Sequence, residues 1–242
     1  MKVELLTHTP DAEKLIAAAA KLCYSKSDVA TLMDNLTPEK TADFLKMLED
    51  LGHESPVEHA SFTFAIEGVS RTLLAQITRH RIASFSVQSQ RYVSKTDFPY
   101  IIPPEIEAIP EAKEEFLAAM AEDAAHYESI RQKLIAHYTA DGMDARAAEK
   151  KANEDARFVL PNACDTRIIM TMNVRSLHNF FRLRCCNRAQ WEIRALAVAM
   201  LRECRAACPL LFGKAGPSCL WGACSEGAYS CGKAAEIRRE LR

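Results

Sequence analysis

Residues 79–91 read RHRIASFSVQSQR and combine three arginines, one histidine, three serines and two glutamines with few large apolar side chains. Alternate side chains of an extended chain lie on one face, so Ser89 and Arg91 can present a hydroxyl and a forked cation together. Such a pair suits a phosphate group. A short Arg-His-Arg sequence is also typical of a solvated basic turn. The length of this polar segment, between helical and strand-like flanks, favours an anion-binding site.

The sequence on either side of this segment predicts a mixed α and β fold. Residues 61–66 alternate aromatic or aliphatic side chains with small ones, which is typical of a strand with one buried face. A helix is expected from residue 70 to about residue 79, with Gln76 and Arg79 three positions apart on its polar face. Further strands are expected at 3–6 and 166–172, and further helices at 10–23, 37–51, 111–137, 145–156, 175–184 and 190–207.

The composition is that of a globular protein with a sizeable core. The chain has 242 residues, of which 48% are hydrophobic, and this length fits one large domain or two small ones. We expect a single domain over residues 1–242. The 31 basic residues balance 32 acidic ones, so the net charge favours neither a nucleic acid nor a membrane surface as partner. The sequence has no secretory signal pattern and no apolar run of membrane-spanning length, and we expect a cytoplasmic protein.

Nine cysteines without a secretory signal indicate reduced thiols rather than a disulfide framework. Four of them, Cys208, Cys219, Cys224 and Cys231, lie in a cysteine- and glycine-rich C-terminal tail at about residues 208–242. A zinc site there is conceivable. However, four and six residues separate the last three cysteines, and these spacings are unlike the short cysteine pairs of zinc sites. We therefore expect no metal, and small thiols in a glycine-rich loop packed on the body of the protein.

The polar segment resembles the signature of the flavin-dependent thymidylate synthases, in which Arg-His-Arg is followed after seven residues by a serine. Here these residues are Arg79, His80, Arg81 and Ser89. Other segments similar to that family are HESPVEH at 53–59, RFVLP at 157–161, NVRSLHNF at 173–180, LR at 183–184 and AQWEI at 189–193. Together they extend over roughly residues 50–95 and 155–210, in the family's order.

The resemblance implies both a fold and a reaction. The fold is α+β, with helices packed on an antiparallel sheet in one domain, and it forms a homotetramer whose sites combine residues of neighbouring subunits. The reaction converts dUMP to dTMP, with methylenetetrahydrofolate as carbon donor, FAD as hydride carrier and NADPH as reductant. The chain has no glycine-rich dinucleotide fingerprint, so the expectation of FAD depends on the resemblance alone.

The resemblance also implies the site residues, and it implies no metal ligand. The residues expected to bind dUMP are Gln76, Arg79, Ser89, Gln90, Arg91, Arg157 and Arg184. Those expected to bind FAD are Ser55, Glu58, Arg79, His80, Arg81, Ile82, Asn173, Arg175 and Asn179. From the residues alone, Arg157 could equally be a helix-end arginine that balances the helix dipole. His53 could either assist the folate or cap the end of a helix.

Arg184 is the expected catalytic residue. Its guanidinium stays protonated at any working pH, so beside the uracil ring it can stabilise the negative charge left by loss of the N3 proton. The ring then becomes nucleophilic at C5, and the enzyme needs no covalent nucleophile. Without the resemblance, Arg184 would be an ordinary arginine at a helix C-terminus.

Two other classes of protein remain open on the residues alone. A thiol-dependent nucleotide enzyme could use Cys185 or Cys186, because the neighbouring charge of Arg184 could lower the pKa of either thiol. A non-catalytic RNA-binding module could use the arginine cluster, although the balanced net charge and the small number of aromatic residues disfavour it.

Overall fold

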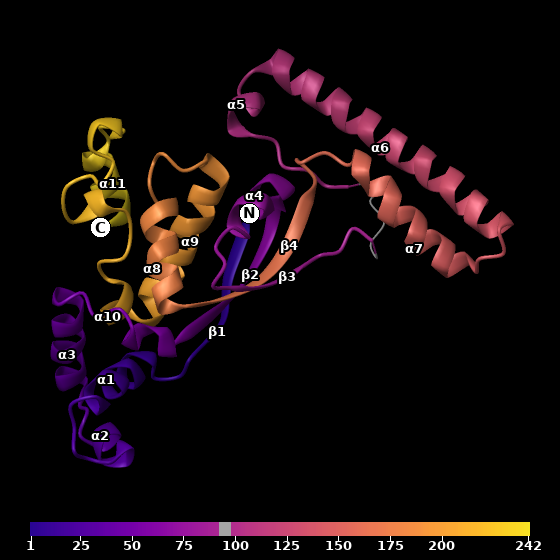
Figure 1. Ribbon diagram of the computed structural model, residues 1–242. Helices are drawn as coiled ribbons and strands as arrows, with labels where there is room; N and C mark the ends of the chain where they lie inside the picture. Colours follow the sequence, from indigo (N-terminus) through magenta and orange to yellow (C-terminus); the bar gives the residue numbers. More distant parts are fainter. Residues whose placement is uncertain (92–97) are drawn as a thin grey trace. The chain divides into compact units, whose positions relative to one another are not determined.

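The computed structural model describes residues 1–91 and 98–242 (Figure 1). The chain divides into two compact units. The first unit comprises residues 1–66, 76–86 and 168–242, and the second comprises residues 67–75 and 87–167. The prediction of a single domain over the whole chain stays a prediction.

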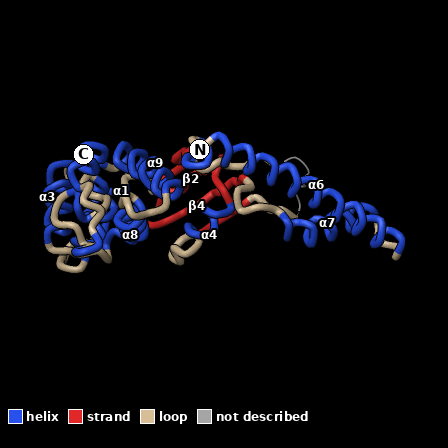
Figure 2. The backbone as a smooth tube through the Cα atoms, turned by 90° about the horizontal axis from the view of Figure 1, so that it is seen from above, coloured by secondary structure: helices blue, strands red, loops and turns tan. Residues whose placement is uncertain are grey.

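Among the described residues, four strands form one antiparallel sheet in the order β1-β2-β4-β3. Figure 2 draws the strands in red, with β2 and β4 labelled. They are β1 Lys2–His8, β2 Ser61–Ser70, β3 Ser84–Val87 and β4 Asp165–Asn173. In the first unit, the hydroxyls of Thr63 and Thr171 share a hydrogen bond of 2.9 Å between β2 and β4, and this cross-strand pair helps to fix their register. The sheet and its helices confirm the predicted α+β class.

Helices make up much of the remaining chain. They are α1 Ala12–Leu22, α2 Val29–Asp34, α3 Pro38–Asp50, α4 Arg71–Ile77, α5 Pro104–Glu107, α6 Pro110–Ala140, α7 Ala145–Ala156, α8 Val174–Arg184, α9 Trp191–Ala207, α10 Pro209–Phe212 and α11 Ala234–Leu241, with short 3₁₀ turns η1 Pro56–His59, η2 Arg157–Val159, η3 Ser218–Leu220 and η4 Gly227–Tyr229. Every helix predicted from the sequence is present, with small shifts at its ends. The helices α2, α5, α10 and α11 and the strand β3 were not predicted.

Local capping chemistry explains where several helices begin and end. The Thr37 hydroxyl accepts the backbone N–H of Lys40 at 3.3 Å and so caps α3, as the sequence predicts. Gly52 follows α3 with a φ of 68°, a left-handed conformation that favours glycine at the end of a helix. The Asp144 carboxylate accepts the N–H groups of Arg146 and Ala147 and begins α7.

Phe212 of α10 lies at the centre of an aromatic cluster in the first unit. Its ring packs edge-on against Phe62 of β2 at 5.2 Å and against His178 of α8 at 5.3 Å. Phe181, also from α8, is 6.0 Å away. The three phenylalanines have no exposed surface. The cluster therefore packs α8 against β2 and α10.

The second unit contains the helical pair α6 and α7, which run side by side (Figure 1). Arg131 of α6 donates from Nε to the side-chain Oδ1 of Asn153 on α7 at 2.9 Å. The same guanidinium pairs with Glu128 at 3.0 Å and with Glu149 at 2.8 Å. Its planar fork of donors thus joins the two helices.

The C-terminal tail corrects the expectation of a glycine-rich loop, because it contains α10, η3, η4 and α11. Ile237 and Leu241 of α11 are buried and supply its apolar face. Arg205 of α9 donates to the carbonyls of Phe212 at 3.1 Å and Ala215 at 2.8 Å, and also to that of Leu241. One long side chain therefore satisfies carbonyls from both ends of the tail, and the glycine content of the tail hides this order in the sequence.

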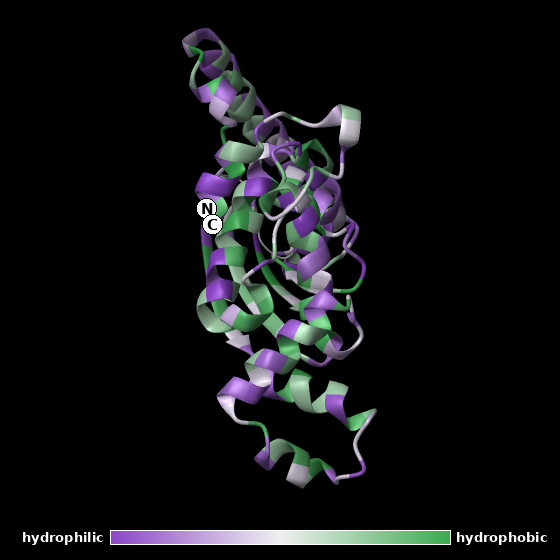
Figure 3. Ribbon diagram, turned by 90° about the vertical axis from the view of Figure 1, so that its left-hand side faces the viewer, coloured by the Kyte–Doolittle hydropathy of each residue, from purple (hydrophilic) through white to green (hydrophobic). Residues whose placement is uncertain are grey.

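In the described part of the chain, no helix combines the length and apolar character needed to cross a membrane. Hydrophilic residues are interspersed along the helices (Figure 3). The nine cysteines are all free thiols. Within residues 1–91 and 98–242, no three histidine, cysteine or acidic side chains are grouped so that they could hold a metal ion.

Candidate functional site

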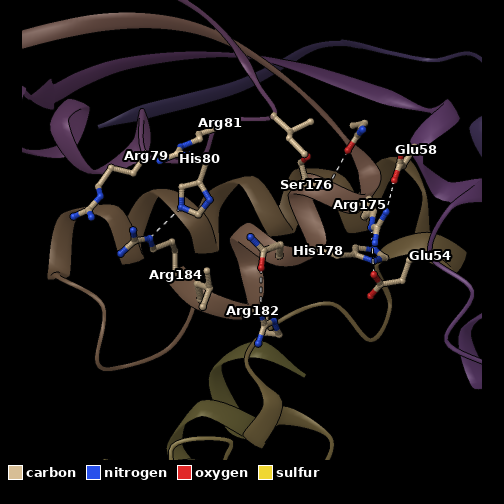
Figure 4. A pocket seen from close by; sticks show the side chains of 14 residues that line it. Glu54, Glu58, Arg79, His80, Arg81, Arg175, Ser176, His178, Arg182 and Arg184 are labelled. Carbon is tan, nitrogen blue, oxygen red and sulfur yellow. Dashed lines mark hydrogen bonds and ion pairs between the residues drawn. The ribbon is translucent and has the colours of Figure 1, made fainter.

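A cleft of about 880 Å³ opens in the first unit, and three separate segments of the chain line it (Figure 4). These segments are the loop around η1, the turn after α4, and the exposed face of α8. The lining residues are Glu54, Glu58, Arg79, His80, Arg81, Ile82, Asn173, Arg175, Ser176, His178, Asn179, Arg182, Leu183 and Arg184. Most are polar, and five are arginines.

Direct junctions between strands and helices bring two of these segments into position. β2 continues without a loop into α4 at Arg71, and α4 ends at Ile77, so residues 79–82 form the turn that leads to β3. β4 likewise continues directly into α8. Asn173 ends the strand and caps the helix, because its side-chain oxygen accepts the N–H of Ser176 at 2.8 Å.

The periodicity of α8 separates a polar face from a buried face. Arg175, Asn179 and Arg182 recur at intervals of four and three residues and line the cleft together with His178. On the other side, residues such as Leu177 are fully buried. His178 donates from Nε2 to the Leu211 carbonyl at 2.9 Å, and burial lowers its pKa, so the ring is held neutral.

Arg175 connects the η1 loop to α8. Its Nε donates to Glu54 at 3.2 Å and its Nη1 pairs with Glu58 (Figure 4). The hydrogen bond that Arg175 donates to Glu58 is the main reason that the pKa of Arg175 is raised. The cleft lining contains these two carboxylates and five arginines, so it is cationic and suits an anionic ligand.

The side chains of Arg184 and His80 point toward each other in the cleft lining (Figure 4). Arg184 donates from Nε to Nε2 of His80 at 3.2 Å. Burial and then the charge of Arg184 lower the pKa of His80, and burial and then the charge of Arg79 lower the pKa of Arg184. Because His80 accepts at Nε2, its neutral ring carries the proton on Nδ1.

Eight of the nine residues expected to bind FAD line this one cleft. They are Glu58, Arg79, His80, Arg81, Ile82, Asn173, Arg175 and Asn179. Ser55 is the exception. It precedes η1, and its carbonyl accepts the N–H of Glu58 at 3.2 Å, so it supports the loop instead of lining the cleft.

Three of the residues expected to bind dUMP, namely Gln76, Arg79 and Arg184, belong to the first unit. The expected helix to Arg79 is too long, because α4 ends at Ile77 and Arg79 lies in the following turn. Gln76 donates to the Gln190 side-chain oxygen at 3.5 Å. That same oxygen accepts the N–H groups at the start of α9, so Gln76 is linked to a helix cap.

The other four expected dUMP residues, Ser89, Gln90, Arg91 and Arg157, belong to the second unit. Arg91 pairs with the Glu154 carboxylate at 2.7 Å, and Arg157 donates to the Glu154 carbonyl at 3.0 Å. The Ser89 hydroxyl accepts the N–H of Arg91 at 3.1 Å. Three of the four thus meet near the end of α7.

Sequence reasoning missed Arg71, which holds the side chain of Gln90, the fourth of these expected dUMP residues. Arg71 donates to the Gln90 side-chain oxygen at 3.0 Å and to the Thr166 hydroxyl at 3.5 Å. Burial lowers its pKa, and the charge of Arg157 lowers it further. The only sequence signal was its position at the expected start of a helix, where an arginine is unfavourable for the helix dipole.

Other cleft residues were also missed, namely Glu54, Ser176, His178, Arg182 and Leu183. For two of them a signal was available. His178 and Arg182 lie three and seven residues after Arg175, so they share its helical face. Glu54 had no such signal, since only the folded chain brings it to Arg175.

A smaller pocket of about 250 Å³ adjoins the cleft and shares Glu54, His178 and Arg182 with it. His53 lines this smaller pocket, and leucines such as Leu45 and Leu211 form part of its wall. His53 is therefore not part of the main cleft.

The structure corrects the expectation that Arg184 lowers the pKa of Cys185. Cys185 is fully buried, and burial raises the pKa of its thiol to about 12. The nearby charges of Arg194 and Arg205 only partly oppose that rise. A thiol of this kind is protonated at neutral pH and is a poor nucleophile. Cys186 is half-buried.

Comparisons with known proteins agree with one another. The family described as thymidylate synthase complementing protein matches residues 4–210. A flavin-dependent thymidylate synthase from Clostridium tetani is 56% identical over 99% of this chain and 96% of its own length. One from Geobacter sulfurreducens is 48% identical over 100% of this chain and 98% of its own. One from Pyrococcus furiosus is 37% identical over 93% of this chain and 90% of its own.

Proposed function

This chain belongs to the family of flavin-dependent thymidylate synthases, and we propose that its chemistry takes place at the cleft of the first unit. The protein converts dUMP to dTMP by reductive methylation and uses FAD. The observation that supports the placement is the meeting of eight expected FAD residues with Arg184 in one cationic cleft.

The side chains of the cleft fit a flavin dinucleotide. Its volume of about 880 Å³ lies within the range of roughly 300–1,000 Å³ for small-molecule sites. Arg79, Arg81 and Arg182 can pair with the diphosphate through their forked donors, and the amides of Asn173 and Asn179 can bind its sugars or rings. When bound, FAD supplies the hydride that the methylation consumes.

Arg184 is the catalytic residue in this proposal. Its guanidinium is held at the end of α8 in a partly buried cleft, where a charge interacts more strongly than in water. Beside the uracil ring it would stabilise the charge left when N3 loses its proton. The ring would then attack the one-carbon unit through C5. This route uses no thiolate, which agrees with the raised pKa of Cys185.

The forked guanidinium groups of Arg79 and of Arg91 are each suited to the phosphate of dUMP. We expect Arg79→Ala and Arg91→Ala each to weaken dUMP binding by about 10- to 150-fold, because a hydrogen bond to a charged group is worth about 1.5–3 kcal/mol. Arg79→Lys is expected to recover only part of the affinity, since lysine lacks the fork. Calorimetric titration of dUMP into the FAD-loaded protein measures the effect.

Arg167→Ala is the matched control for this prediction. Arg167 is an exposed arginine of the second unit, and its ion pair with Glu67 is loose at 3.9 Å. The Arg167→Ala variant is expected to bind dUMP with the affinity of the unmodified protein. Unchanged affinity in both Arg79→Ala and Arg91→Ala would refute the phosphate assignment.

The remaining parts of the reaction follow from family membership. We propose methylenetetrahydrofolate as carbon donor, with His53 and its small pocket as a contact for the folate, and NADPH as reductant. We also propose a homotetramer with shared sites, supported by the exposed apolar side chains of Leu6 and Ile169 on β1 and β4. Light scattering should then give four times the 27.0 kDa mass of the chain. A cytoplasmic location stays a prediction.

One preparation tests the function directly. The purified protein should show the absorption bands of bound FAD, and should form dTMP from dUMP when methylenetetrahydrofolate and NADPH are supplied. A colourless protein that takes up no FAD, forms no dTMP and binds RNA with a steep salt dependence would instead support the RNA-binding alternative.

A further inference from the structure

The position of Arg184 raises the question of what orients its side chain. Arg184 is the last residue of α8, and the chain leaves the helix at Cys185. A side chain at a helix end is flexible, and an arginine carries about 2 kcal/mol of rotamer entropy when it is free. The side-chain hydrogen bond that the structure gives Arg184 runs to His80.

We propose that His80 is a positioning residue for Arg184, and that its neutral imidazole holds the guanidinium in the direction that catalysis requires. This inference rests on the catalytic role proposed for Arg184. It gives His80 a function that differs from the flavin contact implied by the resemblance, although the same ring can serve both.

The atoms used in this contact support the proposal. Arg184 donates to His80 from Nε, which lies at the inner edge of the guanidinium. The two terminal nitrogens and their four N–H groups are therefore left to face a ligand. A contact through a terminal nitrogen would use part of the fork that recognises a pyrimidine or a charged oxygen. His80 thus restrains Arg184 and leaves its recognition edge available.

The ring of His80 is itself held in place. Its plane meets Phe180 edge-on, with ring centroids 5.0 Å apart and an angle of 83°. Phe180 lies one turn before Arg184 on α8, so a single helix supplies both the wall for the imidazole and the guanidinium that it binds. The backbone N–H of His80 donates to the Ile77 carbonyl at 3.1 Å and fixes the start of the turn.

The charges around His80 keep the ring neutral. Arg79 and Arg81 flank it on its own segment, and Arg184 contacts it from α8. The carboxylates of the η1 loop, Glu54 and Glu58, pair with Arg175, and the neighbouring His178 donates to the Leu211 carbonyl. Burial and the charge of Arg184 both lower the pKa of His80. The acceptor nitrogen is therefore available at neutral pH.

The hydrogen bond between Arg184 and His80 depends on pH in a defined direction. When His80 binds a proton, Nε2 becomes a donor and can no longer accept from Arg184, and two cations then oppose each other. Because the pKa of His80 is lowered from its ordinary value, the contact is intact at neutral pH and is lost as the pH falls through the lowered pKa. We expect kcat to fall on the acid side for this reason.

The experiment compares His80→Gln, His80→Leu and the unmodified protein at saturating FAD and dUMP. Glutamine retains an acceptor oxygen that does not titrate, whereas leucine retains bulk without an acceptor. We expect His80→Leu to lower kcat by about 10- to 100-fold, as a misplaced catalytic group does, with KM for dUMP changing less. At pH 8 the kcat of His80→Gln should stay within a few-fold of that of the unmodified protein. At acid pH the kcat of His80→Gln should fall less than that of the unmodified protein. The phosphate of dUMP also titrates near pH 6, so the comparison is made between variants.

His126→Leu serves as the control, because His126 is an exposed histidine of α6 outside the cleft, and its pH profile should match that of the unmodified protein. A His80→Leu enzyme whose kcat is normal once FAD saturates would overturn the proposal and leave His80 as a flavin contact only. Equal losses in the two His80 variants at every pH would overturn it as well.

A measurement without turnover separates this inference from the proposed function. Exchange of the histidine C2 hydrogen, followed by mass spectrometry, gives the pKa of each histidine in the FAD-loaded protein. In Arg184→Gln the pKa of His80 should rise, because a neighbouring cation is removed. An unchanged pKa of His80 would refute the contact even in an enzyme that forms dTMP. If the pKa of His80 rises in Arg184→Gln but the unmodified protein forms no dTMP, the contact is supported and the proposed function is contradicted.

Discussion

Arg184→Ala is expected to lower kcat for dTMP formation by about 10²–10³, because it removes the charge that stabilises the deprotonated uracil ring. The helix end itself should survive the change. The Cys185 N–H that follows Arg184 bonds to the Phe181 carbonyl through the backbone, and the Arg184 side chain is only partly buried. Product formation is measured at saturating dUMP, so that a change in binding does not lower the rate.

Three further variants test whether the enzyme uses a covalent nucleophile. Ser89→Ala should weaken dUMP binding yet keep measurable turnover, since the Ser89 hydroxyl lies beside Arg91 and accepts its N–H. Cys185→Ala and Cys186→Ala should remain active. Mass spectrometry of the denatured enzyme during turnover gives the complementary result. A dUMP adduct on one of these side chains, together with complete loss of turnover in the matching alanine variant, would replace the Arg184 mechanism with a nucleophilic one.

Phe212→Ala is expected to lower the free energy of unfolding by about 3–5 kcal/mol, the usual cost of removing a buried phenylalanine ring. Phe212 is fully buried and its ring meets Phe62, His178 and Phe181. The cavity would open directly behind α8, so loss of FAD affinity should accompany the loss of stability. Urea titration followed by circular dichroism measures the first effect, and flavin fluorescence the second.

Phe158→Ala is the matched control, because it deletes the same ring from a site that is 83% exposed. Its effect on stability should stay within about 0.5 kcal/mol. If the two variants unfold at the same urea concentration, Phe212 does not support the core in the way described. If Phe212→Ala is unstable but binds FAD normally, the aromatic cluster does not support the polar face of α8.

Much of the fold could be predicted from local chemistry. The capping threonine before α3, the left-handed glycine after it and the alternation in β2 each act over a few residues, so sequence reasoning finds them. Less could be predicted where tertiary contacts decide. α2 and α11 have six and eight residues and are too short to form reliably alone, so packing stabilises them. The sequence likewise gave no signal that α4 ends at Ile77 and not at Arg79.

Some features of the candidate site could also be predicted from the sequence, and others depend on the fold. Residues of the FAD group were assigned by resemblance, and the fold brings eight of them to one cleft. The pairing of Arg175 with Glu54 joins positions 121 residues apart and follows from no local pattern. Cys185 shows the converse error. Its sequence neighbour is charged, but the fold buries the thiol, and this burial outweighs the nearby charges in setting its pKa.

The direct passage from β4 into α8 restricts how the length of this chain can vary. One added residue in β4 would turn α8 by about 100° and carry Arg175 and Asn179 away from the cleft. It would also reverse the inward and outward side chains of the strand beyond it. The turn between α6 and α7 has no such restriction, since Asp141 and Gly142 are exposed and carry no cleft residue. Insertions should therefore accumulate at that turn among functional variants and be absent from β4.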